Sequence, residues 1–163
     1  MDDGSALIGA SPALARVTHA GERRVLTLGP LRLAYLESEV AGSEGPVLEL
    51  LLPPGVRDWP KVAFERTQLT YFVVSGEVVF SSGARTVLAG AETSISVPPG
   101  LRHALGNEAA SEAHVLLLAR PGGLHRYFEA LAGLRARSRG WPPDPPDPLE
   151  AIERAFGVLR EQG

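Results

Sequence analysis

Glycine and proline divide this chain into short apolar segments, and this punctuation constrains the possible folds more than any other feature. The 163 residues include 18 glycines and 14 prolines. Many stand together in turn-forming runs such as Pro53-Pro54-Gly55 and Pro98-Pro99-Gly100, where proline presets φ and glycine accepts a positive φ. The apolar segments between the runs have the length of strands. The pattern therefore predicts an all-β body, either a sandwich or a barrel.

The apolar segments predict ten strands joined by turns. We find no internal repeat among them. The expected strands are residues 24–28, 31–37, 47–52, 62–64, 69–74, 77–80, 85–88, 93–97, 103–105 and 112–119.

Apolar residues take a helical period after residue 123. This spacing, with charged residues on the other side, predicts an amphipathic helix. A proline-rich linker at residues 141–146 follows, and it is too stiff and too poor in hydrogen-bond donors for regular structure. The apolar residues of the helix are Leu124, Tyr127, Phe128, Leu131 and Leu134.

The linker leads into a second predicted helix. Asp147 is expected as its N-cap, Pro148 at its first helical position and Glu150 as the partner residue of a capping box. Because apolar stripes need a surface to cover, we expect both helices to pack on the β body or on a partner chain. The stripe of the second helix is Leu149, Ile152, Phe156 and Leu159.

The charge of the chain argues against a nucleic-acid partner. Its 16 basic and 19 acidic residues give a net charge of −3, and the basic residues are spread along the chain rather than gathered in a patch. The absence of cysteine removes disulfides, thiolate nucleophiles and cysteine-ligated metal centres. The sequence also lacks a Gly-x-Ser-x-Gly elbow, a phosphate-binding loop and a dinucleotide fingerprint. The corresponding hydrolases and nucleotide-binding proteins are therefore not expected.

The sequence gives no indication of secretion or of a membrane segment. Met1 is followed by the acidic Asp2 and Asp3 where a secretory signal would be basic, and no apolar region with a cleavage site follows. The apolar runs are far shorter than the roughly 20 residues of a membrane-spanning helix. We expect a cytoplasmic protein with no membrane partner.

Residues 70–107 carry a family resemblance. They read TYFVVSGEVVFSSGARTVLAGAETSISVPPGLRHALGN, which resembles the double-motif barrel of the cupin family. The second cupin motif is matched by Pro98, Gly100, His103 and Asn107, and it lacks only its first glycine, where Glu92 stands. The resemblance implies a single cupin β-barrel, a small jelly roll, in which Asn107 has a structural role. The architecture also resembles small quercetinase-like cupins.

The first cupin motif, which carries most of the family's metal ligands, is degenerate here. When the motif is anchored on Gly76, the family's glutamate falls on Leu69 and its two histidines fall on Val62 and Phe64. Of the four ligands that the resemblance implies, His103 alone is left. Because a mononuclear catalytic site needs about three protein ligands, we expect no metal and no other cofactor.

Apolar side chains therefore stand where the family's ligands point into the barrel. His103 is expected to project into this apolar cup, with the Tyr71 hydroxyl as a second polar group. Such a cup is either a small-molecule pocket or the filled core of a small barrel. A one-residue shift of register would instead turn Glu65 inward. By the alternation of strands, the predicted lumen residues are Val62, Phe64, Leu69, Tyr71 and Val73.

His103 is the candidate catalytic residue. An apolar surround would lower its pKa and suit it to general acid or base catalysis; the alternative is an idle residue hydrogen-bonded to the backbone. Arg66 and Arg102 are expected near the barrel mouth, either to meet an anionic ligand group or as solvated surface residues. His19 and His125 are expected at the surface.

These expectations combine into one hypothesis with two alternatives. Residues 1–20 form an N-terminal extension, 21–120 the barrel and 121–163 a C-terminal helical extension, in a homodimer formed through exposed strand edges and helix stripes. The protein binds a small apolar or aromatic molecule in the lumen without a metal, with or without catalysis. One alternative is an enzyme, either a quercetinase-like dioxygenase or a metal-free isomerase or cyclase that uses His103 as proton shuttle. The other is an interaction protein with a filled barrel.

Overall fold

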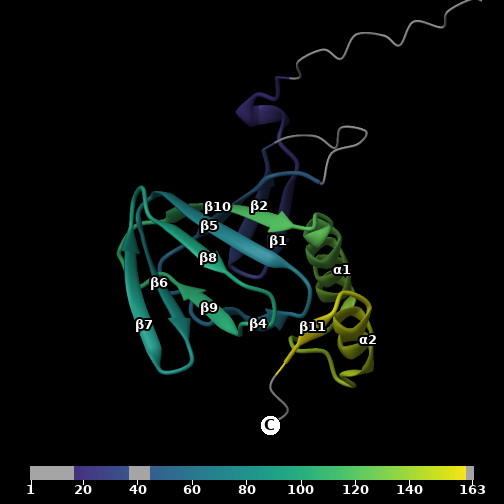
Figure 1. Ribbon diagram of the computed structural model, residues 1–163. Helices are drawn as coiled ribbons and strands as arrows, with labels where there is room; N and C mark the ends of the chain where they lie inside the picture. Colours follow the sequence, from purple (N-terminus) through teal and green to yellow (C-terminus); the bar gives the residue numbers. More distant parts are fainter. Residues whose placement is uncertain (1–16, 37–44, 161–163) are drawn as a thin grey trace, which may run out of the picture.

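Two antiparallel sheets that face each other form the body of the molecule, in a computed structural model that describes residues 17–36 and 45–160 (Figure 1). The six-stranded sheet contains, in order across it, β1 (Val25–Leu28), β2 (Leu31–Tyr35), β3 (Leu48–Leu52), β10 (Ala113–Arg120), β5 (Gln68–Ser75) and β8 (Ser94–Val97). The five-stranded sheet contains β11 (Val158–Leu159), β4 (Trp59–Phe64), β9 (His103–Gly106), β6 (Glu77–Ser82) and β7 (Arg85–Gly90). The helices are η1 (Ala20–Glu22), α1 (Leu124–Arg137) and α2 (Asp147–Ala155).

The prediction of a mostly β chain that ends in two helices is confirmed. Each of the ten expected strands corresponds to an observed one, with shifted ends; the expected end of the second strand at residue 37 lies outside the described residues. The additional strand β11 was missed, because two residues are too short to give a pattern. Two facing antiparallel sheets are consistent with a jelly roll.

Strand alternation brings the predicted lumen residues of β5 inside. Leu69, Tyr71 and Val73 are buried, whereas Thr70 and Phe72 between them are partly exposed. The same alternation buries one side of β10. Each fully buried side chain of this size stabilises the fold by about 1.5–3 kcal/mol, so the register of these two central strands is strongly determined.

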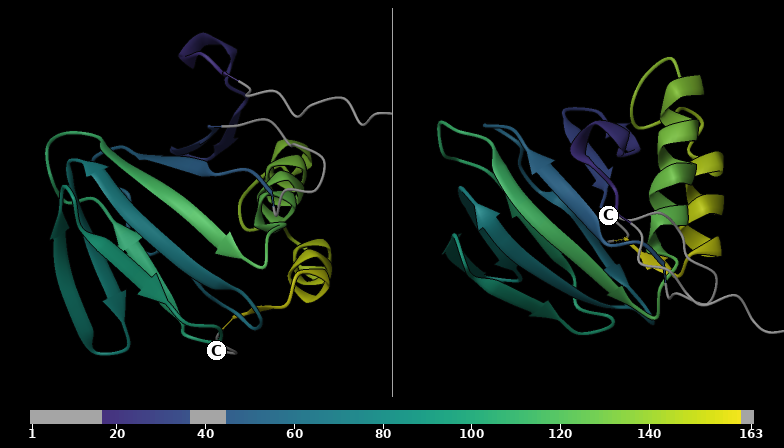
Figure 2. Two further views of the ribbon diagram at one scale, coloured as in Figure 1. Left: turned by 45° about the horizontal axis from the view of Figure 1, so that its top comes forward. Right: turned by 90° about the horizontal axis from the view of Figure 1, so that it is seen from above.

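Helix α1 covers one end of the sheets. All five apolar residues predicted for its stripe are buried, and the helix packs against β1 and α2. Aromatic rings join it to β4: Trp59 stacks on Phe128 at 5.5 Å, and Phe64 meets Tyr127 edge-on at 5.6 Å between ring centroids. The two helices lie side by side, away from β6 and β7 (Figure 2). Within residues 17–36 and 45–160, no helix is long and apolar enough to cross a membrane.

The predicted capping of α2 is wrong. The N–H groups of Leu149 and Glu150 donate to the carbonyl of Pro146, which makes Pro146 the N-cap. Asp147 and Pro148 thus occupy the first two helical positions, and Asp147 makes no capping hydrogen bond. A capping box needs its acidic partner three residues after the N-cap, and Glu150 lies one residue too far.

The predicted apolar stripe of α2 also extends too far. Gly157, with a φ of 63°, ends the helical path, and its carbonyl accepts a hydrogen bond from the N–H of Glu65 at 2.8 Å. The chain then continues as β11, where Val158 is buried and pairs with Phe64. Leu159, expected on the helix, lies on this strand and is 45% exposed.

Gly76, on which the first motif was anchored, makes the turn from β5 to β6. Its φ is 79°, a conformation that glycine adopts without strain. A Cβ at this position would lie 2.8 Å from the Cα of Ala113 on β10. Both the positive φ of the turn and the close approach of Gly76 to β10 therefore require glycine.

Asn107 ties the two sheets together. Its side-chain amide donates to the carbonyls of Leu52 and Ser111, both at 2.8 Å, and its side-chain oxygen accepts from the N–H of Ala109 at 2.9 Å. Asn107 follows β9, and Leu52 ends β3 of the other sheet. The asparagine of the second motif is thus a structural residue, as the resemblance implies.

Replacing Asn107 should destabilise the protein strongly. In an Asn107→Ala variant, buried backbone groups lose their partners, so we expect the free energy of unfolding to fall by about 2–4 kcal/mol, measured by urea denaturation. The matched control is Ser111→Ala, because Ser111 contributes only its main-chain carbonyl and its side chain is exposed. Its effect should stay within about 0.5 kcal/mol; an equal loss in both variants would contradict the role of Asn107.

Candidate functional site

A buried hydrogen bond between Tyr71 and His103 joins the inner faces of the two sheets. Tyr71 lies on β5 of the six-stranded sheet, and His103 is the first residue of β9 in the five-stranded sheet. The Tyr71 hydroxyl oxygen lies 2.8 Å from Nε2 of His103, and the two residues are 1% and 2% exposed. The structure thus brings together the two polar groups that the sequence places in the apolar cup.

The backbone determines which nitrogen of His103 carries the proton. Nδ1 lies 3.1 Å from the carbonyl oxygen of Leu101, which can only accept a hydrogen bond. Nδ1 is therefore the protonated nitrogen, and Nε2 accepts the hydrogen bond donated by the Tyr71 hydroxyl. The pair has a defined direction: tyrosine donates to histidine, and histidine donates to the backbone.

Burial keeps both members of the pair neutral. Desolvation lowers the pKa of His103 below its usual value, partly offset by the hydrogen bond to Leu101. Desolvation also raises the pKa of Tyr71. The expectation of a lowered histidine pKa in an apolar surround is confirmed, and at neutral pH the pair holds its protons without net charge.

Apolar side chains surround the pair. Val62 is the strand partner of His103 across β4 and β9 and is fully buried. The ring of Phe80 on β6 stacks on the imidazole with centroids 5.9 Å apart and planes inclined by 25°. Phe64 is also buried, but its ring contacts Tyr127 of α1. All the predicted lumen residues are thus in the interior, and Phe64 faces the helical end of it.

These residues do not fit a metal centre. Both ring nitrogens of His103 already have hydrogen-bond partners, and its neighbours Val62 and Phe80 have no ligating atoms. Within residues 17–36 and 45–160, no group of three or more His, Asp or Glu side chains is arranged to hold an ion. The side chain of Glu65 lies near Gly157 of the helical extension, so it is not the inward-facing ligand of a shifted register.

A groove of about 840 Å³ opens between the edge strands β7 and β8. We call it the β7–β8 groove. Strand β7, which contributes Arg85, Val87 and Ala89 to its lining, lies on the side of the molecule away from the helices (Figure 1). The apolar lining residues of the groove are Phe80, Val87, Ala89, Ile95 and Leu101. Its polar and charged lining residues are Ser82, Arg85, Thr93, Ser94, Ser96 and Arg102.

Phe80 forms the wall between the groove and the buried pair. It lines the groove and stacks on His103, whereas Tyr71, His103 and the other predicted lumen residues are absent from the lining. No motif in the sequence singles out Phe80, Arg85 or Val87. The alternation of inward and outward side chains along β6 and β7 could have indicated them. Phe80 and Val87 are strand partners, and Arg85 lies two residues before Val87 on the same face of β7.

The two arginines expected at the barrel mouth lie at different cavities. Arg102 lines the β7–β8 groove, but Arg66 lines a different cavity of about 450 Å³ between the β4–β5 turn and the two helices. The turn containing Arg66 points toward the helical extension, which contributes Arg126 and Arg154 to the same cavity. The side chain of Arg66 is 86% exposed, so of its two alternatives the solvated surface residue holds, and Arg66 does not accompany Arg102 in the groove.

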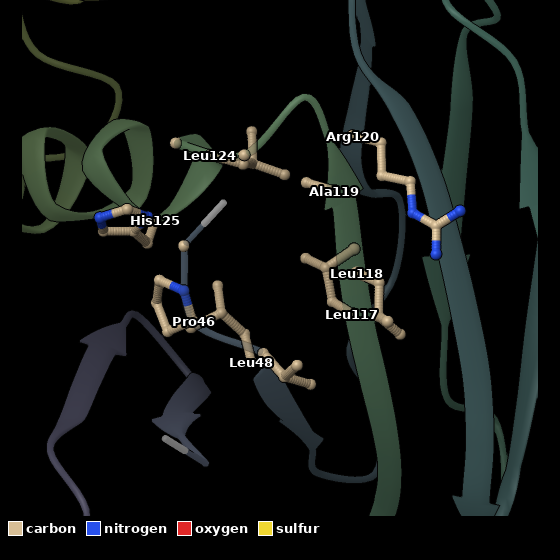
Figure 3. Close-up of a pocket in the computed structure, with 12 residues that line it drawn as sticks. Pro46, Leu48, Leu117, Leu118, Ala119, Arg120, Leu124 and His125 are labelled. Carbon is tan, nitrogen blue, oxygen red and sulfur yellow. The ribbon is translucent and has the colours of Figure 1, made fainter. Parts of the chain in front are cut away.

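A third, smaller cavity lies where β10 meets α1 (Figure 3). Its volume of about 140 Å³ is below the roughly 300–1,000 Å³ of typical ligand sites. His125 lines it from the first turn of α1, is only 5% exposed, and packs edge-on against Tyr35. The predicted surface position is thus wrong for His125 and confirmed for His19.

Comparison with known proteins finds structural relatives only. No protein-family model matches the chain, and no curated protein matches its sequence. A predicted oxalate decarboxylase from Thermotoga maritima is 20% identical with a TM-score of 0.54, over 64% of this chain and 97% of that one. The polyketide cyclase RemF from Streptomyces resistomycificus is 15% identical with a TM-score of 0.56, over 65% of this chain and 79% of that one.

The nucleoside dehydratase Pac13 is 25% identical with a TM-score of 0.51, over 70% of this chain and 88% of that one. A Streptomyces Pac13 variant with a tyrosine replaced by phenylalanine, in a structure with uridine, is 26% identical with a TM-score of 0.50. In a further uridine structure of that protein, a histidine is replaced by glutamine.

The lowered pKa of His103 predicts how the free energy of unfolding depends on pH. The unfolded chain binds a proton at this residue below pH 6.5, its usual pKa, whereas the folded chain resists it. The contribution of His103 to the free energy of unfolding is therefore fully present above pH 6.5, and it is lost as the pH falls below that value. We expect the difference in unfolding free energy between wild type and His103→Gln to be smaller at pH 5.5 than at pH 7.5, in urea titrations. A difference that is the same at both pH values would contradict a buried, neutral His103.

Proposed function

The chain has a cupin fold, and we propose that it binds a small apolar or aromatic molecule in the β7–β8 groove without a metal. One observation carries the proposal: Phe80, stacked on the buried imidazole of His103, forms the inner wall of an apolar groove of about 840 Å³. Aromatic rings prefer offset stacking on other rings. A planar ligand is expected to lie against Phe80.

The size and lining of the groove support this class of ligand. Small-molecule sites are typically concave, of roughly 300–1,000 Å³, mostly apolar, with a few polar groups that orient the ligand. The apolar contribution here comes from both sheets, since Val87 belongs to β7 and Ile95 to β8. Ser94 and Ser96 provide hydroxyl groups at the β8 edge.

The predicted lumen residues do not line the groove themselves. His103 supports Phe80 from the core by ring stacking, and Tyr71, Val62, Leu69 and Val73 are buried in the interior. We propose that His103 and Tyr71 orient the ligand through Phe80, which stacks on the imidazole and lines the groove, and that the protein acts as a cytoplasmic homodimer.

A second candidate function is metal-free acid–base catalysis. The observation that favours it is the directed Tyr71–His103 hydrogen bond, a neutral donor and acceptor pair in an apolar interior. Pac13, at 25% identity, is a nucleoside dehydratase, and a tyrosine and a histidine are the residues replaced in its uridine structures. In this candidate, His103 accepts and returns a proton through the Tyr71 hydroxyl. A quercetinase-like dioxygenase is a further alternative, and it would need a metal. An interaction protein with a filled barrel is another, and it would need no small-molecule ligand.

A charge placed on the groove wall should strongly weaken the binding of a neutral apolar probe. Val87→Glu inserts a carboxylate among apolar lining residues at a position already 49% exposed, so the fold should tolerate it. The neutral fluorescent probe N-phenyl-1-naphthylamine should bind the wild type and bind this variant at least about tenfold more weakly. Leu88→Glu is the matched control, because Leu88 is 61% exposed and points to the opposite face of β7.

Two results would count against the proposal. Equal binding of the probe by both variants would place the ligand elsewhere. Stoichiometric iron, nickel, copper or manganese in protein purified without chelator would overturn the metal-independent function and favour the dioxygenase.

The catalytic candidate is tested with uridine as the first probe. If the pair acts on a nucleoside, uridine should bind the wild type, and Tyr71→Phe should reduce turnover of an identified nucleoside substrate by about 100-fold or more, with little change in affinity. Absence of uridine binding at millimolar concentration in ligand-observed NMR would remove uridine as the substrate, and full turnover by Tyr71→Phe would remove this candidate.

A further inference from the structure

We infer that the β7–β8 groove selects molecules that carry a negative charge, and that its ligand class is an aromatic acid whose anionic group lies at the Arg85 and Arg102 end. The inference rests on the proposed binding function and adds the charge and orientation of the ligand. It follows from the distribution of charge in the lining, from the backbone contacts that bring the two arginines together, and from the spacing along β7.

The groove is positively charged although the chain is not. Among residues 17–36 and 45–160, its lining contains Arg85 and Arg102 and no acidic side chain, whereas the whole chain has a net charge of −3. The positive charge is therefore a local property. Guanidinium groups bind carboxylates through paired hydrogen bonds, which gives both attraction and orientation.

Backbone contacts bring the two arginines to the same end of the groove. Arg85 starts β7 and is the strand partner of Ser82 at the end of β6. The Ser82 hydroxyl donates to the main-chain carbonyl of Arg102 at 2.8 Å. Ser82 thus stands between the backbones of Arg85, at the start of β7, and Arg102, in the loop before β9.

The apolar lining extends from this end along β7. Arg85, Val87 and Ala89 all line the groove, as alternate residues of one strand face do. Two residues along a strand span about 7 Å. The apolar surface at Val87 and Ala89, opposite Ile95, therefore begins about 7 Å from the charged end and continues to about 13 Å. One or two fused aromatic rings with a carboxylate substituent match this arrangement, with the ring system against Phe80.

Two probes that share one ring system test the inference. 8-Anilinonaphthalene-1-sulfonate and N-phenyl-1-naphthylamine differ in the sulfonate, so their affinities separate the contribution of charge from that of the apolar groove. We expect the wild type to prefer the anionic probe by about five- to tenfold. Arg85→Gln should remove most of this preference, while affinity for the neutral probe changes less than about twofold, and Arg85→Lys should restore part of it.

The control variant is Arg139→Gln, which removes the same charge from an exposed residue outside the groove. If it lowers the affinity for the anionic probe as much as Arg85→Gln does, the effect is one of net charge and the inference is overturned. If the wild type binds both probes equally, the inference fails and the proposed function stands. If neither probe binds, the proposed function itself fails.

A second copy of the chain is the competing occupant of the groove. In that case the affinity for both probes would fall as protein concentration rises through the range in which light scattering detects dimers. That result would overturn a small-molecule site between β7 and β8.

Discussion

The interaction on which the rest of the structure depends is the buried hydrogen bond from Tyr71 to His103, which crosses from one sheet to the other. Each residue would otherwise leave a polar group unpaired in an apolar interior, at a cost of about 1–3 kcal/mol. The Leu101 carbonyl accepts the hydrogen bond donated by Nδ1–H, so both ring nitrogens of His103 have partners within the protein. Phe80 then stacks on its ring. The one side chain that matches a metal ligand of the second motif, His103, is thus a hydrogen-bonded residue in an apolar interior.

The molecule is closed at one end and open at the other. Aromatic contacts of Trp59 and Phe64 with α1 cover the helical end. At the opposite end the edge strands β7 and β8 belong to different sheets and are not paired with each other, and the inner face of β7 is left accessible, with Val87 49% exposed. A groove at this position can present apolar residues from both sheets to one ligand. Its arginine end adds an orientation that an apolar surface lacks.

Much of the fold could be predicted because the relevant forces are local. Turn residues delimit strands, and alternation decides which side of β5 is inside, so Tyr71 and His103 could be placed in the interior together. The start of α2 was misjudged because Pro146, rather than Asp147, accepts the first hydrogen bonds. His125 was placed at the surface because its burial against Tyr35 depends on a strand far away in the sequence. Such contacts leave no local pattern.

The sequence by itself determined the strand order along the chain, the amphipathic first helix, the loss of metal-ligating side chains at Val62, Phe64 and Leu69, and the inward position of His103. These depend on residue type and on periods of two or about four residues. Only the tertiary structure decided where the molecule is hollow. The β7–β8 groove exists because two edge strands from different sheets face each other without pairing. The pairing of β6 with β7 brings Phe80 and Arg85 to it, and the hydrogen bond from Ser82 to the main-chain carbonyl of Arg102 brings the second arginine. An empty volume depends on all the surfaces around it at once, and no segment of the chain encodes it alone.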